Sequence, residues 1–169
     1  MVPVSVGFPP ILAPSARVLI LGSLPGVISL ERREYYAQPR NVFWRIMGDL
    51  FGFAPALPYA ARKEALVSNG VALWDVCACA RRPGSLDSAI NLDSVKANDF
   101  ALLFSNCAGI GLICFNGAKA SALYAKRVIP SLNLEQRKIP SRILPSTSPA
   151  HASLPYEAKR SAWEILCIR

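Results

Sequence analysis

Arg17-Val-Leu-Ile-Leu-Gly-Ser-Leu-Pro-Gly26 joins an unbroken apolar run to a turn-rich loop, and this stretch decides the fold. The run 17–21, which is aliphatic after Arg17, predicts a short strand that ends in this loop. Ligands bind at the carboxyl ends of such strands in open α/β sheets, so the loop that follows is a candidate binding element. It has neither the G-x-x-x-x-G-K-[ST] nor the G-x-G-x-x-G pattern, which argues against a nucleotide-cofactor fold.

Three more short apolar runs predict strands, and helical patterns lie between them. The expected strands are 71–74, 111–115 and 142–144, and the expected helices begin near residues 41, 58, 117 and 156. This alternation predicts an α/β fold, a three-layer α/β/α sandwich around a mostly parallel four-stranded sheet. The four strands would deliver Ser23, Asp75, Asn116 and the loop 146–148 to one edge, where we expect a shared cleft.

Size and composition favour one domain over residues 1–169, because 52% hydrophobic and 18% charged residues can supply a sizeable core. No apolar run is long enough for a bilayer span and no secretory pattern is present, so a cytoplasmic location is expected. The net charge is +8, and residues 117–169 contribute nine Lys or Arg against three Glu. This asymmetry fits a polyanionic partner such as DNA, although solvated helix faces explain it equally well.

Cysteine and histidine usage limits the chemistry. The five cysteines form no C-x-x-C pair, and they are interpreted as structural rather than as disulfide or metal ligands. His151 is the sole histidine, which excludes a metal centre built from several imidazoles and disfavours a Ser-His-Asp triad. No metal and no cofactor are expected.

The segment Tyr35-Tyr-Ala-Gln-Pro-Arg-Asn-Val-Phe-Trp44 places two aromatic residues and a proline directly before a helix. Asn41 is either a helix cap or a functional amide. Tyr36 could stack on a planar base, with Tyr35 as the alternative, and core packing is open for both. Trp44 is most simply a core residue.

Together with this segment, the motifs Gly22-Ser-Leu-Pro-Gly26, Leu73-Trp-Asp-Val76, Arg82-Pro-Gly-Ser-Leu-Asp-Ser-Ala-Ile90, Phe115-Asn-Gly117 and Leu144-Pro-Ser-Thr-Ser-Pro-Ala150 resemble the uracil-DNA glycosylase superfamily. They are most similar to its hypoxanthine-DNA glycosylases, which are related to the mismatch-specific uracil and thymine enzymes. The resemblance implies a monofunctional base-excision repair enzyme that works as a monomer on double-stranded DNA containing a deaminated base. Because no lysine lies in the main motifs, lyase activity is not expected.

The resemblance also implies roles for individual residues. Asn41 would position the attacking water, and His151 is a candidate to fill the hole left by the flipped base. The residues expected to bind the base are Gly22, Ser23, Leu24, Pro25, Gly26, Tyr36 and Asp75. Those expected to bind DNA are Asn116, Gly117, Ser146, Thr147, Ser148 and His151, and Arg81 and Arg82 are further candidates for gripping the backbone.

Two positions depart from the related uracil enzymes. Leu24 stands where those enzymes carry a water-positioning asparagine, and Leu144 stands where classical uracil enzymes carry a catalytic histidine. Both departures argue against efficient uracil removal. The alternatives are a mismatch-specific uracil-DNA glycosylase, a nucleic-acid-binding module without catalysis, and a small-molecule hydrolase that uses a cysteine with His151.

Overall fold

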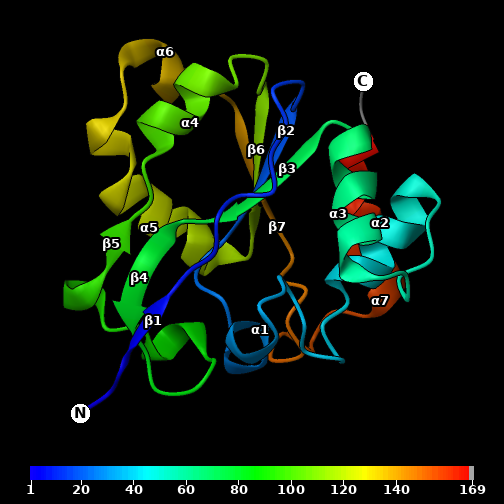
Figure 1. Cartoon of the computed structure of the whole chain (residues 1–169), viewed down its shortest axis with the longest axis horizontal. Coiled ribbons are helices and arrows are strands. Elements are labelled where there is room, and N and C mark those ends of the chain that lie inside the picture. The colour runs from blue at the N-terminus through cyan, green and yellow to red at the C-terminus, as the bar shows by residue number, and fades with distance from the viewer. Residues whose placement is uncertain (168–169) are drawn as a thin grey trace.

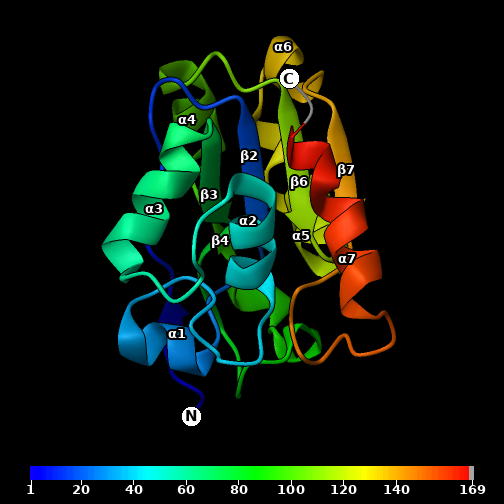
Figure 2. The same ribbon diagram turned by 90° about the vertical axis from the view of Figure 1, so that its right-hand side faces the viewer.

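A computed structural model describes residues 1–167. Its centre is a four-stranded parallel sheet in the order β3-β2-β6-β7 (Figures 1 and 2). The strands are β2 (Val18–Gly22), β3 (Val71–Asp75), β6 (Leu112–Asn116) and β7 (Ser141–Leu144). Every bound lies within one residue of the sequence prediction, so the predicted parallel sheet is confirmed.

Strand β2 explains why the apolar run is uninterrupted. It pairs with β3 on one side and β6 on the other, and side chains alternate between the two faces of the sheet. Leu19 and Leu21 enter one hydrophobic cluster, whereas Val18 and Ile20 enter the other. Because both faces are covered, every residue of the strand is buried.

The helices form a layer on each face of the sheet (Figure 1). One layer contains α2 (Phe43–Phe51), α3 (Tyr59–Ser68) and α7 (Tyr156–Trp163). The other contains α4 (Phe100–Asn106), α5 (Ala118–Arg127) and α6 (Leu134–Arg137). The three-layer prediction is confirmed. The last helix was expected over 156–167, but its final turn, Glu164–Cys167, is a 3-10 helix.

A second, antiparallel sheet was not predicted. It contains β1 (Val4–Val6), β4 (Cys77–Arg81) and β5 (Lys96–Ala97) in the order β1-β4-β5. Only one residue separates β4 from β3, so the chain passes directly from the main sheet into the antiparallel sheet. The segment 82–90 follows β4. That segment includes the short 3-10 turn Asp87–Ala89.

The carboxyl ends of the four parallel strands point toward the same end of the molecule, where the short helix α1 (Val27–Arg32) lies (Figure 2). Further 3-10 turns cover Leu92–Ser94 and Ile129–Ser131. Within residues 1–167, no helix has both the length and the apolar composition that a membrane span needs.

Candidate active site

A cavity of about 600 Å³ opens at the carboxyl ends of the strands. Of the residues expected to act in catalysis or to bind the base or the DNA, all except Gly117 line it, whereas the further candidates Arg81 and Arg82 do not. Its walls come from the loop after β2, the segment between α1 and α2, the end of β3 and the loop after β7. The predicted shared cleft is therefore present, and a volume of this size is typical of a small-molecule site.

The loop 22–26 is fixed through its carbonyl groups, all five of which accept hydrogen bonds from protein donors. Within the described part of the chain, the amide N–H groups of Ser23, Leu24 and Gly26 donate to no protein group. The loop thus keeps its donors free while its acceptors are occupied. Such a set of backbone donors suits an electron-rich ligand.

The Arg82 side chain holds this loop in place. Its side chain donates to the carbonyls of Leu24 and Pro25 and lies 3.6 Å from Asp87, which also accepts a 2.6 Å hydrogen bond from Ser23. Only 4% of Arg82 is exposed, so the sequence-based suggestion that it grips the DNA backbone is wrong. Burial lowers the pKa of its guanidinium, and Asp87 opposes that shift.

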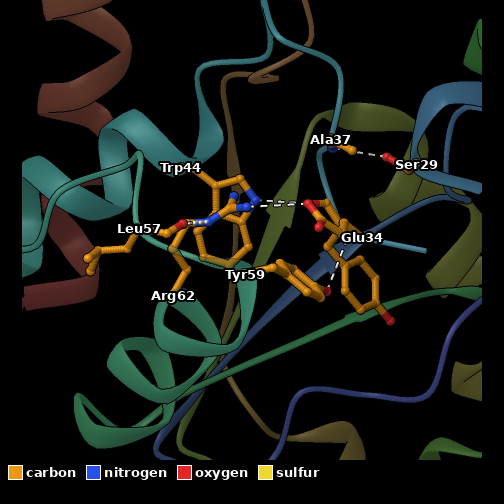
Figure 3. A network of polar contacts seen from close by, with 8 residues as sticks. Ser29, Glu34, Ala37, Trp44, Leu57, Tyr59 and Arg62 are labelled. Atoms are coloured by element: carbon orange, nitrogen blue, oxygen red, sulfur yellow. Dashed lines mark hydrogen bonds and ion pairs between the residues drawn. The ribbon is translucent and has the colours of Figure 1, made fainter. Parts of the chain in front are cut away.

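A polar network braces the segment that leads into α2 (Figure 3). The Trp44 indole donates to the Tyr35 carbonyl at 2.8 Å, and the Tyr35 amide donates to the Tyr59 hydroxyl at 3.1 Å. An ion pair between Arg62 and Glu34, 3.3 Å long, adds a further link. The Ala37 amide donates to the Ser29 hydroxyl at 3.1 Å, so the backbone is held on both sides of Tyr36.

Tyr36 and Tyr35 have different surroundings. Tyr35 is 3% exposed and its hydroxyl donates to the Pro9 carbonyl at 3.0 Å, so it belongs to the core. Tyr36 has a φ of +53°, which is rare for a bulky residue and stores backbone strain. One face of its ring stacks on Phe43, with centroids 4.1 Å apart and planes 28° apart. Tyr36 is half-buried in the cavity wall.

Asn41 is not the N-cap of α2, a position that Val42 occupies without a side-chain cap bond. Its Oδ1 nevertheless accepts a 2.9 Å hydrogen bond from the amide of Phe43, the first residue of α2. The side chain is also partly exposed and lines the cavity. Because Oδ1 faces that amide, the orientation of the side-chain amide is fixed, and within residues 1–167 its Nδ2 donates to no protein group.

Asp75 lies on the cavity floor beside Gly22, its register partner on β2. A Cβ on Gly22 would overlap the Asp75 carboxylate and lie 2.8 Å from the Tyr36 hydroxyl. Glycine is therefore required there by close approach. Burial raises the pKa of the Asp75 carboxyl to about 7, with Asp87 adding to the shift and Arg82 opposing it.

The family model of the uracil DNA glycosylase superfamily matches residues 9–168. The chain belongs to that superfamily. A "Hypoxanthine DNA glycosylase" of Methanosarcina acetivorans is 35% identical over 161 residues, which cover 95% of this chain and 96% of the relative. One of Methanosarcina barkeri is 38% identical over 115 residues, covering 68% and 72%.

A solved structure supports the same assignment. The solution NMR structure of a "putative Uracil DNA glycosylase" from Methanosarcina acetivorans has a TM-score of 0.79 and 32% sequence identity, and the match covers 98% of this chain and 99% of that one. As a superfamily member, the chain is a DNA N-glycosylase, and DNA is its partner. The fold class and the family resemblance expected from the sequence are both confirmed.

Two residues expected to contact DNA in this glycosylase instead join two loops. The Asn116 amide donates to the Thr147 hydroxyl and accepts from the Thr147 amide, both at 2.9 Å. Thr147 is 1% exposed, and its carbonyl accepts from the Val42 amide. A phosphate contact through the Thr147 side chain is therefore corrected to a structural role. The Asn116 side chain is buried beside it.

Two residues of α7 hold the loop after β7 in place. The Lys159 ammonium donates to the His151 carbonyl at 2.6 Å, and the Trp163 indole donates to the Pro145 carbonyl at 3.0 Å. Lys159 is buried, so this member of the basic C-terminal third does not face solvent. Gly117, which the sequence placed in the site, has a φ of +92° and packs against Ser146 instead of lining the cavity.

The cavity rim carries residues that sequence reasoning missed. Arg40 is exposed there, as is Leu86, whose side chain is 58% exposed although it is apolar. His151, which the sequence analysis did predict, lies on the rim as well. Leu86 lies in the motif Arg82–Ile90, in which Arg82 and Asp87 are hydrogen-bonded to the loop 22–26.

Proposed function

We propose that this DNA glycosylase flips hypoxanthine out of double-stranded DNA and hydrolyses its N-glycosidic bond, acting as a monomer in base-excision repair. One observation supports the proposal: Tyr36, Asn41 and the free amides of the 22–26 loop all line the same cavity. Flipping costs a few kcal/mol of unstacking, which contacts in the cavity must offset. The two relatives named as hypoxanthine DNA glycosylases support this choice of base.

Tyr36 is the proposed stacking platform. Phe43 covers one face of its ring, and the strained backbone holds the ring in the cavity wall. A base that enters the cavity can therefore lie against a ring that is already ordered, so little side-chain entropy is lost on binding. The amides of the 22–26 loop supply hydrogen bonds to the charge that develops on the leaving base.

Asn41 is proposed to position water. As the bond between C1′ and the base breaks, the sugar acquires cationic character and water needs placement more than strong deprotonation. The hydrogen bond from Phe43 fixes the Asn41 amide, which leaves Nδ2 and the second lone pair of Oδ1 for the water.

Hypoxanthine is preferred over uracil in this proposal because of two leucines. Leu24 lines the cavity with an aliphatic side chain that cannot hold water. Leu144 packs in the hydrophobic cluster next to the sheet and offers no donor to a uracil carbonyl. The DNA backbone would lie on the rim formed by Arg40, His151 and the hydroxyls of Ser146 and Ser148.

The test is a single-turnover assay on duplexes that contain deoxyinosine or deoxyuridine. Wild-type protein should release hypoxanthine faster than uracil. Asn41→Ala should slow hypoxanthine release by about 10². Asn41→Ser, which retains a good capping oxygen, should slow it nearly as much, because water placement needs the longer amide.

Asn133 provides the matched control. It caps α6 through its side chain, far from the cavity lining. Asn133→Ala should reduce stability by about 1 kcal/mol, as loss of a cap does, without changing the rate of base release. Full activity of Asn41→Ser would mean that Asn41 only supports the start of α2, and the proposed water-positioning role would have to be abandoned.

A further inference from the structure

Two buried polar atoms in the cavity wall have no hydrogen-bond partner among residues 1–167. They are Oδ2 of Asp75 and the hydroxyl of Tyr36. Buried polar groups are nearly always paired, so unpaired atoms beside a cavity point to a functional role. The Asn116 amide lies near the Tyr36 hydroxyl and favours its ionised form, but burial outweighs this and raises the pKa of the phenol.

The surroundings of Asp75 favour its neutral form. It is 4% exposed. Arg82, the cation that acts on it, is already committed to the Leu24 and Pro25 carbonyls and to Asp87. An unpaired carboxyl in such a place binds a proton instead of carrying charge. The titratable and charged groups that face it are Arg82, Asp87, Tyr35, Tyr36, Tyr59 and Cys77.

We propose that Asp75, in its protonated form, is the general acid that donates its proton to ring nitrogen N7 of the leaving purine. This inference rests on the proposed function and deepens it, because it assigns the group that makes a purine a good leaving group. Asp75 lines the cavity into which the base would be flipped, and its unpaired oxygen is within the wall.

When the bond between C1′ and N9 breaks, its electron pair goes to the base while the Asp75 proton moves to N7, and neutral hypoxanthine leaves. Water forms a bond to C1′, and the proton it loses returns through solvent to the Asp75 carboxylate. A general acid of this kind typically contributes 10²–10⁴ in rate.

Purines and uracil differ in the atom that could accept this proton. N7 of a purine has a lone pair that takes no part in the glycosidic bond or the aromatic system, so it accepts a proton readily. Uracil offers only carbonyl oxygens, which are weaker bases. A neutral carboxyl therefore assists purine release much more than uracil release.

The experiment measures single-turnover release by wild-type protein and by Asp75→Asn between pH 5 and 9. The duplexes contain deoxyinosine, 7-deazadeoxyinosine (in which N7 is replaced by carbon) or deoxyuridine. The wild-type rate on deoxyinosine should fall tenfold per unit above about pH 7, because the carboxylate has no proton to donate. Asp75→Asn should lose about 10² at pH 6 and lack this alkaline fall.

The 7-deaza duplex isolates the accepting atom. Wild type should release the 7-deaza base much more slowly than hypoxanthine, and Asp75→Asn should cause little further loss, since both changes remove the same proton transfer. Asp93→Asn, an exposed carboxylate on a 3-10 turn, is the matched control and should behave as wild type on all three duplexes. A single cooperative unfolding transition and duplex binding as tight as wild type would show that Asp75→Asn is folded.

The outcomes separate this inference from the proposed function. If Asp75→Asn releases hypoxanthine at the wild-type rate throughout, or loses as much on the 7-deaza duplex as on deoxyinosine, the acid role is overturned while the proposed function stands. If wild type releases uracil but no hypoxanthine, or no base at all, the proposed function and this inference are overturned together.

Discussion

Replacing Asp75 by asparagine should make the folded protein progressively more stable than wild type as the pH rises. The pKa of this carboxyl rises from 3.8 to about 7 on folding, so between these values the folded state binds more protons than the unfolded state. Stability is then lost as pH increases. With 1.36 kcal/mol per unit, the cost of Asp75 is about 2 kcal/mol at pH 5 and about 4 kcal/mol at pH 8.

Asparagine occupies the same volume and has no such titration. The difference in unfolding free energy between Asp75→Asn and wild type should therefore shift by roughly 2–3 kcal/mol in favour of the variant from pH 5 to pH 8. Urea unfolding followed by circular dichroism at the two pH values measures it. Asp93→Asn, on the surface, should change stability by less than about 0.5 kcal/mol at either pH.

A pH-independent difference between Asp75→Asn and wild type would refute the reasoning, because it would mean that the carboxyl titrates alike in the folded and unfolded states. A shift of the opposite sign would mean that the folded protein stabilises the carboxylate. In that case Arg82 would be an effective counter-ion for Asp75, in spite of its contacts with the loop carbonyls.

Two further substitutions test how the loop 22–26 is held. Arg82→Ala should destabilise the protein by roughly 3 kcal/mol in chemical unfolding, because it leaves two buried carbonyls without donors, whereas Arg81→Ala, on the exposed neighbour, should have little effect. Equal effects would contradict the buried role. Gly22→Ala should reduce stability by roughly 2 kcal/mol and abolish base release, because its Cβ displaces Asp75 and Tyr36. Gly111→Ala is the control and should be tolerated, because its Cβ meets no atom of the described chain within 4 Å. A fully active Gly22→Ala would show that the floor of the cavity is less tightly packed than described.

The candidate site could be predicted largely from position along the strands. Ser23, Asp75 and Asn116 follow or end parallel strands, and parallel topology brings such positions to one edge whatever the details of packing. The motif resemblance placed Tyr36 and Asn41 at the same edge. All of these residues line the cavity.

The orientation of individual side chains could not be predicted in the same way. Arg82 looks like a surface cation in the sequence, yet it is buried because the carbonyls of the loop 22–26 need donors. Thr147 resembles a phosphate ligand but pairs with Asn116. The antiparallel sheet was missed because β1 is short, mostly exposed and paired with a strand more than seventy residues away.

The amino-acid sequence alone determined the α/β class, the parallel sheet and the edge at which the site lies, because hydrophobic periodicity and strand order are local and topological properties. Only the tertiary structure decided which polar groups are paired and which remain free. Hydrogen bonding and desolvation depend on neighbours that are distant in the chain. Those neighbours bury Arg82 in contacts with backbone carbonyls, and among the described residues they leave Oδ2 of Asp75 without a hydrogen-bond partner at the floor of the cavity.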